Sequence, residues 1–392
     1  MSLLEVITKA SAESQSLYSP SDYPIVLDPD SIFANLKPKL DDPNPLSAAT
    51  LLSGWQISQT DSELSELGKK FTTKLKKKLK NPVKFDKAEF LAMLNPFLDK
   101  IREKAGISIG VDSSNAGRTL ILVEKVGSYM GKDVAGLVLD ACVDLEVWEL
   151  VGTLIASGLV SNSCYESLVP KIVVKRRSDL LCLCVKHASD LGSSELVLIL
   201  KYFLSPPKDA YASIVEVRKE WESQALLAAE KASDKSLSGK KLSMAKEAAV
   251  LLMVAYDGFS SAELCLHYLL VSKNLDEVIL SSTISKLNGK EMVSLLQYLG
   301  KWLKKYVRFP QAVPCHKAST ALGLKACDWV PKLEDVVKCI GVVLDENYSA
   351  LVLHPEFHEE LRSISVVVGS LTLEARLCCS VANVADKLKA EV

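Results

Sequence analysis

The spacing of apolar residues along most of the chain predicts α-helices. Apolar side chains recur every three or four residues, which places them on one face of a helix. No segment alternates apolar and polar residues for long enough to predict a sheet. Helices are therefore expected at residues 61–80, 87–104, 119–130, 133–157, 164–174, 178–191, 194–204, 208–231, 242–256, 260–272, 275–285, 290–307, 333–344, 355–370 and 371–389.

Short polar turns separate these segments, so neighbouring helices are expected to pair as antiparallel hairpins. Gly131, Gly158 and Gly192 stand where a glycine would cap the C-terminal end of a helix. No repeat of fixed length between about 34 and 47 residues is present. The pattern predicts an all-α fold, an irregular helical-repeat scaffold of α-solenoid-like hairpins.

Composition divides the chain into four parts. Residues 1–105 form a charged helical section with Pro-rich loops, in which short helices are expected at 2–10 and 47–55. The Gly- and Ser-rich segment 106–118 is the expected linker. Apolar hairpins fill 119–207, and a C-terminal helical region fills 208–392. Within that region, 315–330 is expected to be a connecting loop.

Charge and cysteine content point to a soluble intracellular protein. The 392 residues carry a formal net charge of −1, so no global field recruits nucleic acid or anionic membrane. Most of the 10 cysteines lie in apolar helical runs, as reduced thiols do. The N-terminal residues lack the pattern of a secretory signal. The longest uncharged run, residues 150–165, has 16 residues, too few to cross a bilayer.

A run of lysines is the strongest charge feature. It predicts either a nuclear-targeting or phosphate-contacting patch with weak RNA binding, or an ordinary solvated helix face. The second interpretation rests on Phe71, Leu75 and Leu79, which recur as an apolar stripe. The lysines concerned are Lys69, Lys70, Lys74, Lys76, Lys77, Lys78 and Lys80. A smaller basic group, from Lys171 to Arg177, is expected to be a solvated turn.

One stretch resembles a phosphate-binding loop but departs from its pattern. Between Gly127 and Gly131 there are three residues where that loop needs four, and Asp133 follows Lys132 where Ser or Thr is required. A helix–turn–helix join explains the stretch better.

The cysteines and histidines give no metal-ligand pattern. Cys182 and Cys184 would point in different directions on a helix, and Cys315, His316 and Cys327 lack the paired spacing of a zinc site. His354, His358 and Glu359 form an acid–base pair only in the formal sense, and no nucleophile motif occurs. The sequence predicts no enzyme activity, no cofactor or metal, and no small-molecule ligand.

Aromatic residues near the C-terminal end form the candidate partner face. Trp302 and Tyr306 lie in an amphipathic stretch with lysines on one side, and Tyr348 lies in a later segment. Aromatic side chains often anchor interfaces. Core packing is the alternative for Trp302.

Residues 333–356 predict a helix, a short connection and a second helix. Leu333, Val336, Val337, Ile340 and Leu344 have helical spacing and are expected to share one face. The polar residues 345–347 interrupt that face. Pro355 then suits the first turn of the next helix, where its missing N–H needs no partner.

Three local features of residues 291–392 resemble the C-terminal helical region of the nucleolar protein 11 family. Residues 292–299, Met-Val-Ser-Leu-Leu-Gln-Tyr-Leu, resemble its leucine-rich helix. The stretch from Val336 through Leu344 and Asp345 to Tyr348 is similar to its helix ending in a Leu-Asp and aromatic turn. Residues 355–367 resemble its closing Pro-Glu helix.

The resemblance implies a non-catalytic scaffold in nucleolar ribosome biogenesis. Such a factor of the small-subunit processome supports transcription of ribosomal DNA and maturation of the small-subunit rRNA. It acts by holding other processome proteins, so the expected location is the nucleus and nucleolus. The alternative is a general helical-repeat protein–protein adaptor in another nuclear or cytoplasmic complex. The family usually has an N-terminal β-propeller, for which this sequence predicts no strands.

Overall fold

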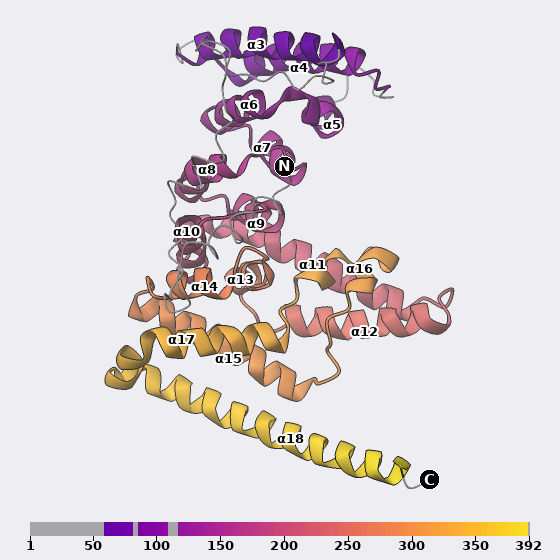
Figure 1. Ribbon diagram of the computed structural model, residues 1–392, viewed down its shortest axis with the longest axis vertical. Helices are drawn as coiled ribbons and strands as arrows, with labels where there is room; N and C mark the ends of the chain where they lie inside the picture. The colour runs from indigo at the N-terminus through magenta and orange to yellow at the C-terminus, as the bar shows by residue number, and fades with distance from the viewer. Residues whose placement is uncertain (1–58, 81–84, 109–116, 391–392) are drawn as a thin grey trace, which may run out of the picture. The chain divides into compact units, whose positions relative to one another are not determined.

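Helices make up all of the regular structure that can be described (Figure 1). The computed structural model describes residues 59–80, 85–108 and 117–390, with side chains described as far as Asp386. Within these ranges there are sixteen α-helices and no strand, and the 3-10 segments have five residues or fewer. The all-α prediction is confirmed, and the packed helices make antiparallel contacts.

The N-terminal half of the described chain contains short, closely packed helices. They are α3 (Gln59–Leu79), α4 (Lys87–Lys104), α5 (Arg118–Val126), η2 (Gly127–Met130), α6 (Lys132–Asp144), α7 (Trp148–Ala156), α8 (Asn162–Val174), α9 (Ser178–His187), α10 (Ser193–Leu204) and η3 (Lys208–Ala210).

The C-terminal half contains the longest helices. They are α11 (Tyr211–Ser233), α12 (Gly239–Tyr256), α13 (Ser261–Val271), α14 (Glu277–Ile284), α15 (Gly289–Arg308), α16 (His316–Leu322), η4 (Lys325–Trp329), α17 (Leu333–Leu353), η5 (Pro355–Phe357) and α18 (His358–Ala390).

Side-chain caps start several helices where the sequence requires them. The Asp86 carboxylate accepts from the Glu89 N–H at 2.7 Å and begins α4. Ser260 and Asn288 each form a capping box with a glutamate three residues later. Gly158 lies beyond α7 with φ of 66°, as predicted for a capping glycine, whereas Gly192 precedes α10 instead of ending α9.

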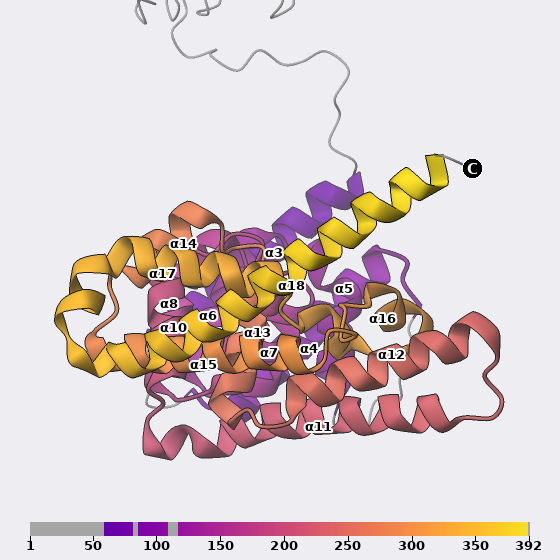
Figure 2. The same ribbon diagram turned by 90° about the horizontal axis from the view of Figure 1, so that it is seen from below.

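Helices close in the sequence pack against one another along the described chain. The helix α3 contacts α4 and α6, α7 contacts α5 and α9, and α10 contacts α8, α13 and α14. The longest hairpin pairs α11 with α12, side by side in Figure 2. At the C-terminal end, α15 packs against both α17 and α18. One continuous apolar core runs through these layers.

Several predicted boundaries were wrong. The expected helix 133–157 is broken into α6 and α7 at Glu146, which has a φ of 55° although no glycine or proline marks the turn. The expected loop 315–330 contains α16 and η4. The helix expected to end at Leu344 continues to Leu353, with a kink at Asn347, and the two helices expected after it form the single α18.

Other predictions fall outside the described residues or stay predictions. The helices expected at 2–10 and 47–55, and residues 109–116 of the expected linker, lie outside the described ranges. The division into sections ending at 105, 118 and 207 stays a prediction.

Candidate interaction surfaces

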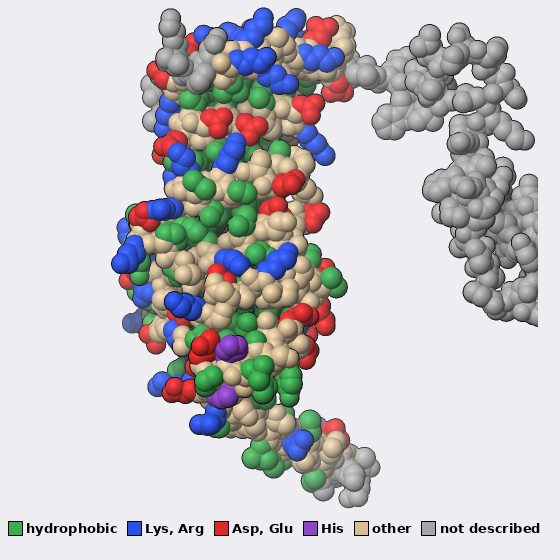
Figure 3. Space-filling view, turned by 90° about the vertical axis from the view of Figure 1, so that its left-hand side faces the viewer, with side chains coloured by type: hydrophobic (Ala, Val, Ile, Leu, Met, Phe, Trp, Pro, Cys, Tyr) green, Lys and Arg blue, Asp and Glu red, His purple; other side chains and the backbone are tan. Residues whose placement is uncertain are grey.

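The lysine run lies on one face of α3. Its opposite face, with Phe71 and Leu75, is buried, and the Phe71 ring stacks on Phe97 with 4.1 Å between centroids. At about 100° per residue, six of the lysines fall within roughly 160° of arc on the outer side. All seven predicted lysines are exposed, and Figure 3 shows blue side chains gathered over this end of the described chain. The six are Lys69, Lys70, Lys74, Lys76, Lys77 and Lys80.

Few carboxylates neutralise this basic face. Lys70 lies 3.7 Å from Glu66, and Lys78 pairs with Glu89 of α4. The other five predicted lysines make no ion pair with a described residue. Like charges this close repel one another, so binding of an anion would relieve the repulsion.

The second basic group differs because every member has an acidic partner. Lys171 lies 3.6 Å from Asp140 and 3.7 Å from Asp144. Arg177 binds Asp179 through two hydrogen bonds of 2.9 and 2.6 Å. The remaining pairs are Lys175 with Glu146 and Arg176 with Asp209. This group is locally neutralised, which supports its interpretation as a solvated turn.

Trp302 and Tyr306 lie in the core and offer no surface to a partner. Trp302 is 1% exposed and Tyr306 8%. Their rings stack with centroids 5.6 Å apart, and the Tyr306 hydroxyl donates to the Pro331 carbonyl. Of the lysines in the same stretch, Lys304 is exposed, whereas Lys301 and Lys305 are half-buried. Core packing therefore explains both Trp302 and Tyr306, and neither belongs to a partner face.

A buried histidine, which sequence reasoning did not single out, organises the aromatic core around Trp302. His267 of α13 is fully buried, and its ring centroid lies 4.7 Å from that of Phe259 and 4.9 Å from that of Trp302. Nε2–H donates to the Ala255 carbonyl at 3.0 Å, so Nδ1 accepts from the Tyr298 hydroxyl at 2.9 Å. Burial lowers the pKa of His267 to about 3.

This neutral histidine ties three helices together. Its bonds join α13 to the last turn of α12 and to α15. Trp221 of α11 packs edge-on against the same ring at 5.2 Å. A lone histidine inside the apolar run 264–271 was the signal available in the sequence.

Tyr348 belongs to an exposed apolar stripe on α17. The apolar residues that were predicted to share one face of this helix lie on two faces. Val336 and Ile340 are buried against the core, whereas the outer side is open to solvent. The outer residues, with exposed fractions from 36% to 69%, are Leu333, Val337, Leu344, Tyr348 and Val352. Leu333, Val337 and Leu344 lie within roughly 40° of arc at about 100° per residue, and Tyr348 and Val352 follow the kink at Asn347. We call them the α17 outer stripe.

An open groove of about 450 Å³ lies where α10, α11, α13 and α15 meet. Its walls combine apolar residues such as Phe203 and Ile214 with charged ones. Both Glu263 carboxylate oxygens accept from Lys301, at 2.8 and 2.9 Å. Arg218 donates to the Phe259 carbonyl at 3.0 Å. The charged side chains of the groove are therefore already engaged within the fold.

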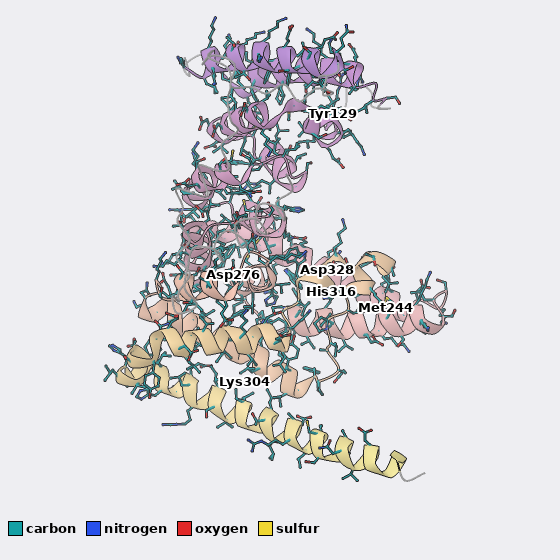
Figure 4. The ribbon with its side chains drawn as sticks, viewed as in Figure 1. Tyr129, Met244, Asp276, Lys304, His316 and Asp328 are labelled. Atoms are coloured by element: carbon teal, nitrogen blue, oxygen red, sulfur yellow. The ribbon has the colours of Figure 1, made fainter. Side chains whose placement is uncertain are left out.

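The cysteines and histidines weighed in the sequence occupy ordinary structural positions. His316 and Asp328 lie beside each other, 3.1 Å apart, in the segment between α15 and α17 (Figure 4). His358 donates from Nε2 to the Val352 carbonyl at 2.9 Å. Burial raises the pKa of both Cys327 and Cys339 to about 12, which keeps them as thiols at neutral pH. Among the described residues, no group of three or more His, Cys, Asp or Glu is placed to hold a metal ion.

Among the described residues, one helix is long and apolar enough to cross a membrane by length and composition. It covers Pro355–Asp386, with a mean hydropathy of 1.6 in its most apolar window, of which 6% is buried.

Comparisons with known proteins add no identification. No protein-family model matches the chain, and no curated protein and no solved structure matches it.

Proposed function

We propose that this protein is a non-catalytic scaffold in nucleolar ribosome biogenesis, acting in the small-subunit processome. The observation that carries the proposal is the resemblance of residues 291–392 to the C-terminal region of the nucleolar protein 11 family. In this role it supports ribosomal DNA transcription and maturation of the small-subunit rRNA. It does so by holding other processome proteins.

The arrangement of the helices supports a scaffold role. Contacts between helices run mainly between near neighbours in the sequence, as in α7 with α9 and α10 with α13. Stacks built in this way present long surfaces to several partners at once. We infer an irregular, α-solenoid-like succession of antiparallel hairpins, of which α11 with α12 is the longest.

The basic face of α3 and the α17 outer stripe suit different kinds of partner. The basic face of α3 suits phosphate groups of RNA, since most of its lysines make no ion pair with a carboxylate of the described residues. No large aromatic side chain is exposed on α3, so contact would be through the phosphate backbone and independent of base sequence. The α17 outer stripe suits an apolar protein partner, with Tyr348 as its most exposed member at 69%.

A general adaptor in another nuclear or cytoplasmic complex is the second candidate. The family's usual β-propeller has no counterpart in the described residues, where no strand occurs. The α17 outer stripe would serve either complex.

Fluorescent tagging of the full-length chain, followed by its depletion, tests the proposal. We expect the tagged protein to concentrate in the nucleolus, and we expect depletion to lower the ratio of small-subunit to large-subunit rRNA. Exclusion from the nucleolus together with an unchanged ratio would reject the nucleolar role and leave the adaptor role.

A further inference from the structure

The C-terminal half of α18 extends away from the helices that its first half contacts (Figures 1 and 2). Its N-terminal turns pack on α15, where Ile364 is buried and Leu361 and Leu371 are half-buried. The approach is close at Gly300, since a Cβ added there would lie 2.8 Å from a Glu360 carboxylate oxygen. From residue 372 to residue 384 every side chain is exposed.

An apolar stripe runs along the side of α18 that faces away from α15. Its large residues are Val366, Leu373, Leu377, Val381 and Val384, each between 58% and 69% exposed. At about 100° per residue they lie within roughly 80° of arc, on the side opposite to Ile364 and Leu371. Val366 and Leu377 are eleven residues apart, and so are Leu373 and Val384. An eleven-residue spacing keeps a stripe almost parallel to the helix axis.

We infer that this stripe binds the same stripe of a second copy of the chain, with the two α18 helices parallel and in register. This inference goes beyond the proposed function. Each large side chain then meets its own copy across a two-fold axis. Because the stripe faces away from α15, the two folded bodies lie on the outer sides of the helix pair.

Charge supports the parallel arrangement. Glu374 and Arg376 are the only charged residues between 363 and 385, and they flank the stripe on opposite sides, about 60° and about 100° away from its centre. In a parallel pair, the Glu374 flank of one helix lies beside the Arg376 flank of the other. An antiparallel pair would instead bring like charges together, which is unfavourable.

The same charges argue against a bilayer as the partner. Glu374 and Arg376 lie close to the middle of the apolar segment 355–386, where charge in a membrane span is strongly disfavoured. Insertion would also remove Ile364 from its contact with α15. A helix lying on an anionic membrane surface would need several basic residues on its polar side, and Arg362 and Arg376 are the only ones between 358 and 386.

The exposed area predicts a weak dimer. A large aliphatic side chain carries roughly 60–120 Å² of apolar surface, from its burial free energy divided by the free energy per unit area. With the exposed fractions given above, the five from each copy supply on the order of 600 Å². This area is below the roughly 1,200 Å² of stable interfaces, so the association should be weak and transient, with a dissociation constant on the order of 10–100 μM.

Sedimentation of the full-length protein over a concentration series tests the inference. The wild type should change from monomer to dimer across the expected range. Leu373→Ser with Leu377→Ser should weaken dimerisation at least about tenfold. Ala375→Ser with Ala382→Ser, on the other side of the same exposed segment, should leave it unchanged. A wild type that stays monomeric at about 200 μM, or a Leu373/Leu377 variant that dimerises like the wild type, would overturn the inference.

Oxidative cross-linking tests the orientation. In a background with Cys378→Ser and Cys379→Ser, Val366→Cys and Val384→Cys, at the two ends of the stripe, should each form a disulfide with their own copy. In an antiparallel pair these residues lie far from their own copies, so cross-linking of neither would overturn the parallel arrangement. Flotation with neutral phosphatidylcholine vesicles tests whether the protein binds a bilayer instead. Co-flotation of a protein that sediments as a monomer would also overturn the inference.

Discussion

Acidification should destabilise this protein through His267 by an amount that the structure sets. The folded chain buries the neutral imidazole and lowers its pKa to about 3, whereas an unfolded chain would titrate near 6.5. Between these two values the unfolded state binds a proton that the folded state does not. Folding stability therefore falls as pH decreases from 6.5 towards 3, and His267 contributes no pH dependence above 6.5.

The size of the effect follows from the same two values. Each pH unit well below 6.5 costs about 1.4 kcal/mol, but the first unit costs less because the unfolded imidazole is only half protonated at pH 6.5. Acidification from about pH 6.5 to about pH 4.5 therefore costs about 2.3 kcal/mol. Other ionisable groups also make the free energy of unfolding depend on pH. A matched variant removes their contribution. His267→Gln keeps a donor for the Ala255 carbonyl and an acceptor for the Tyr298 hydroxyl, but does not titrate.

Urea unfolding of both proteins at several pH values measures the difference. Trp221 and Trp302 pack against His267, so their fluorescence reports the loss of this core. We expect the variant to be less stable at neutral pH, but to lose about 2.3 kcal/mol less than the wild type on acidification. Equal losses in the two proteins, or a His267 imidazole resonance that titrates near pH 6.5 in the folded wild type, would refute the reasoning.

Three further predictions concern the surfaces and the core. Replacing Lys74, Lys76 and Lys77 by Gln should weaken RNA binding and flatten its dependence on the logarithm of salt concentration by about 2 to 3, in filter-binding assays. The same change at the paired residues Lys171, Lys175 and Arg176 should have little effect, and equal effects would argue against an α3 site. Phe71→Ala should cost about 3–5 kcal/mol in thermal unfolding, because it removes the ring stacked on Phe97; a loss below about 1 kcal/mol would contradict that packing. Tyr348→Ser should change stability by less than about 0.5 kcal/mol but reduce recovery of bound proteins, whereas Tyr211→Ser, at a site 63% exposed, should not.

Helices could be predicted from the sequence wherever apolar spacing and end signals agreed. The range of α4 was predicted correctly because Asp86 caps its start and its apolar face is regular. The break at Glu146 was missed because a left-handed residue other than glycine leaves no mark in the sequence. The polar residues before Tyr348 suggested an end to α17, but the backbone only kinks at Asn347 and the helix continues.

The exposed or buried state of a helix face was harder to predict than the helix itself. The lysines of α3 could be placed on the outer side, since few charged side chains are buried without partners. Trp302 and Tyr306 share their face of α15 with Leu299 and Leu303, which was a signal for the core rather than for an interface. On α17 both sides are apolar, and only the packing of α14 and α15 decides which side is covered.

Affinity purification of the tagged full-length protein is the most direct test of the scaffold role. Extracts treated with and without ribonuclease should both yield proteins of the small-subunit processome as the dominant partners, because a scaffold holds them by protein contacts. Recovery of a different, equally reproducible complex, with processome proteins absent, would contradict the account.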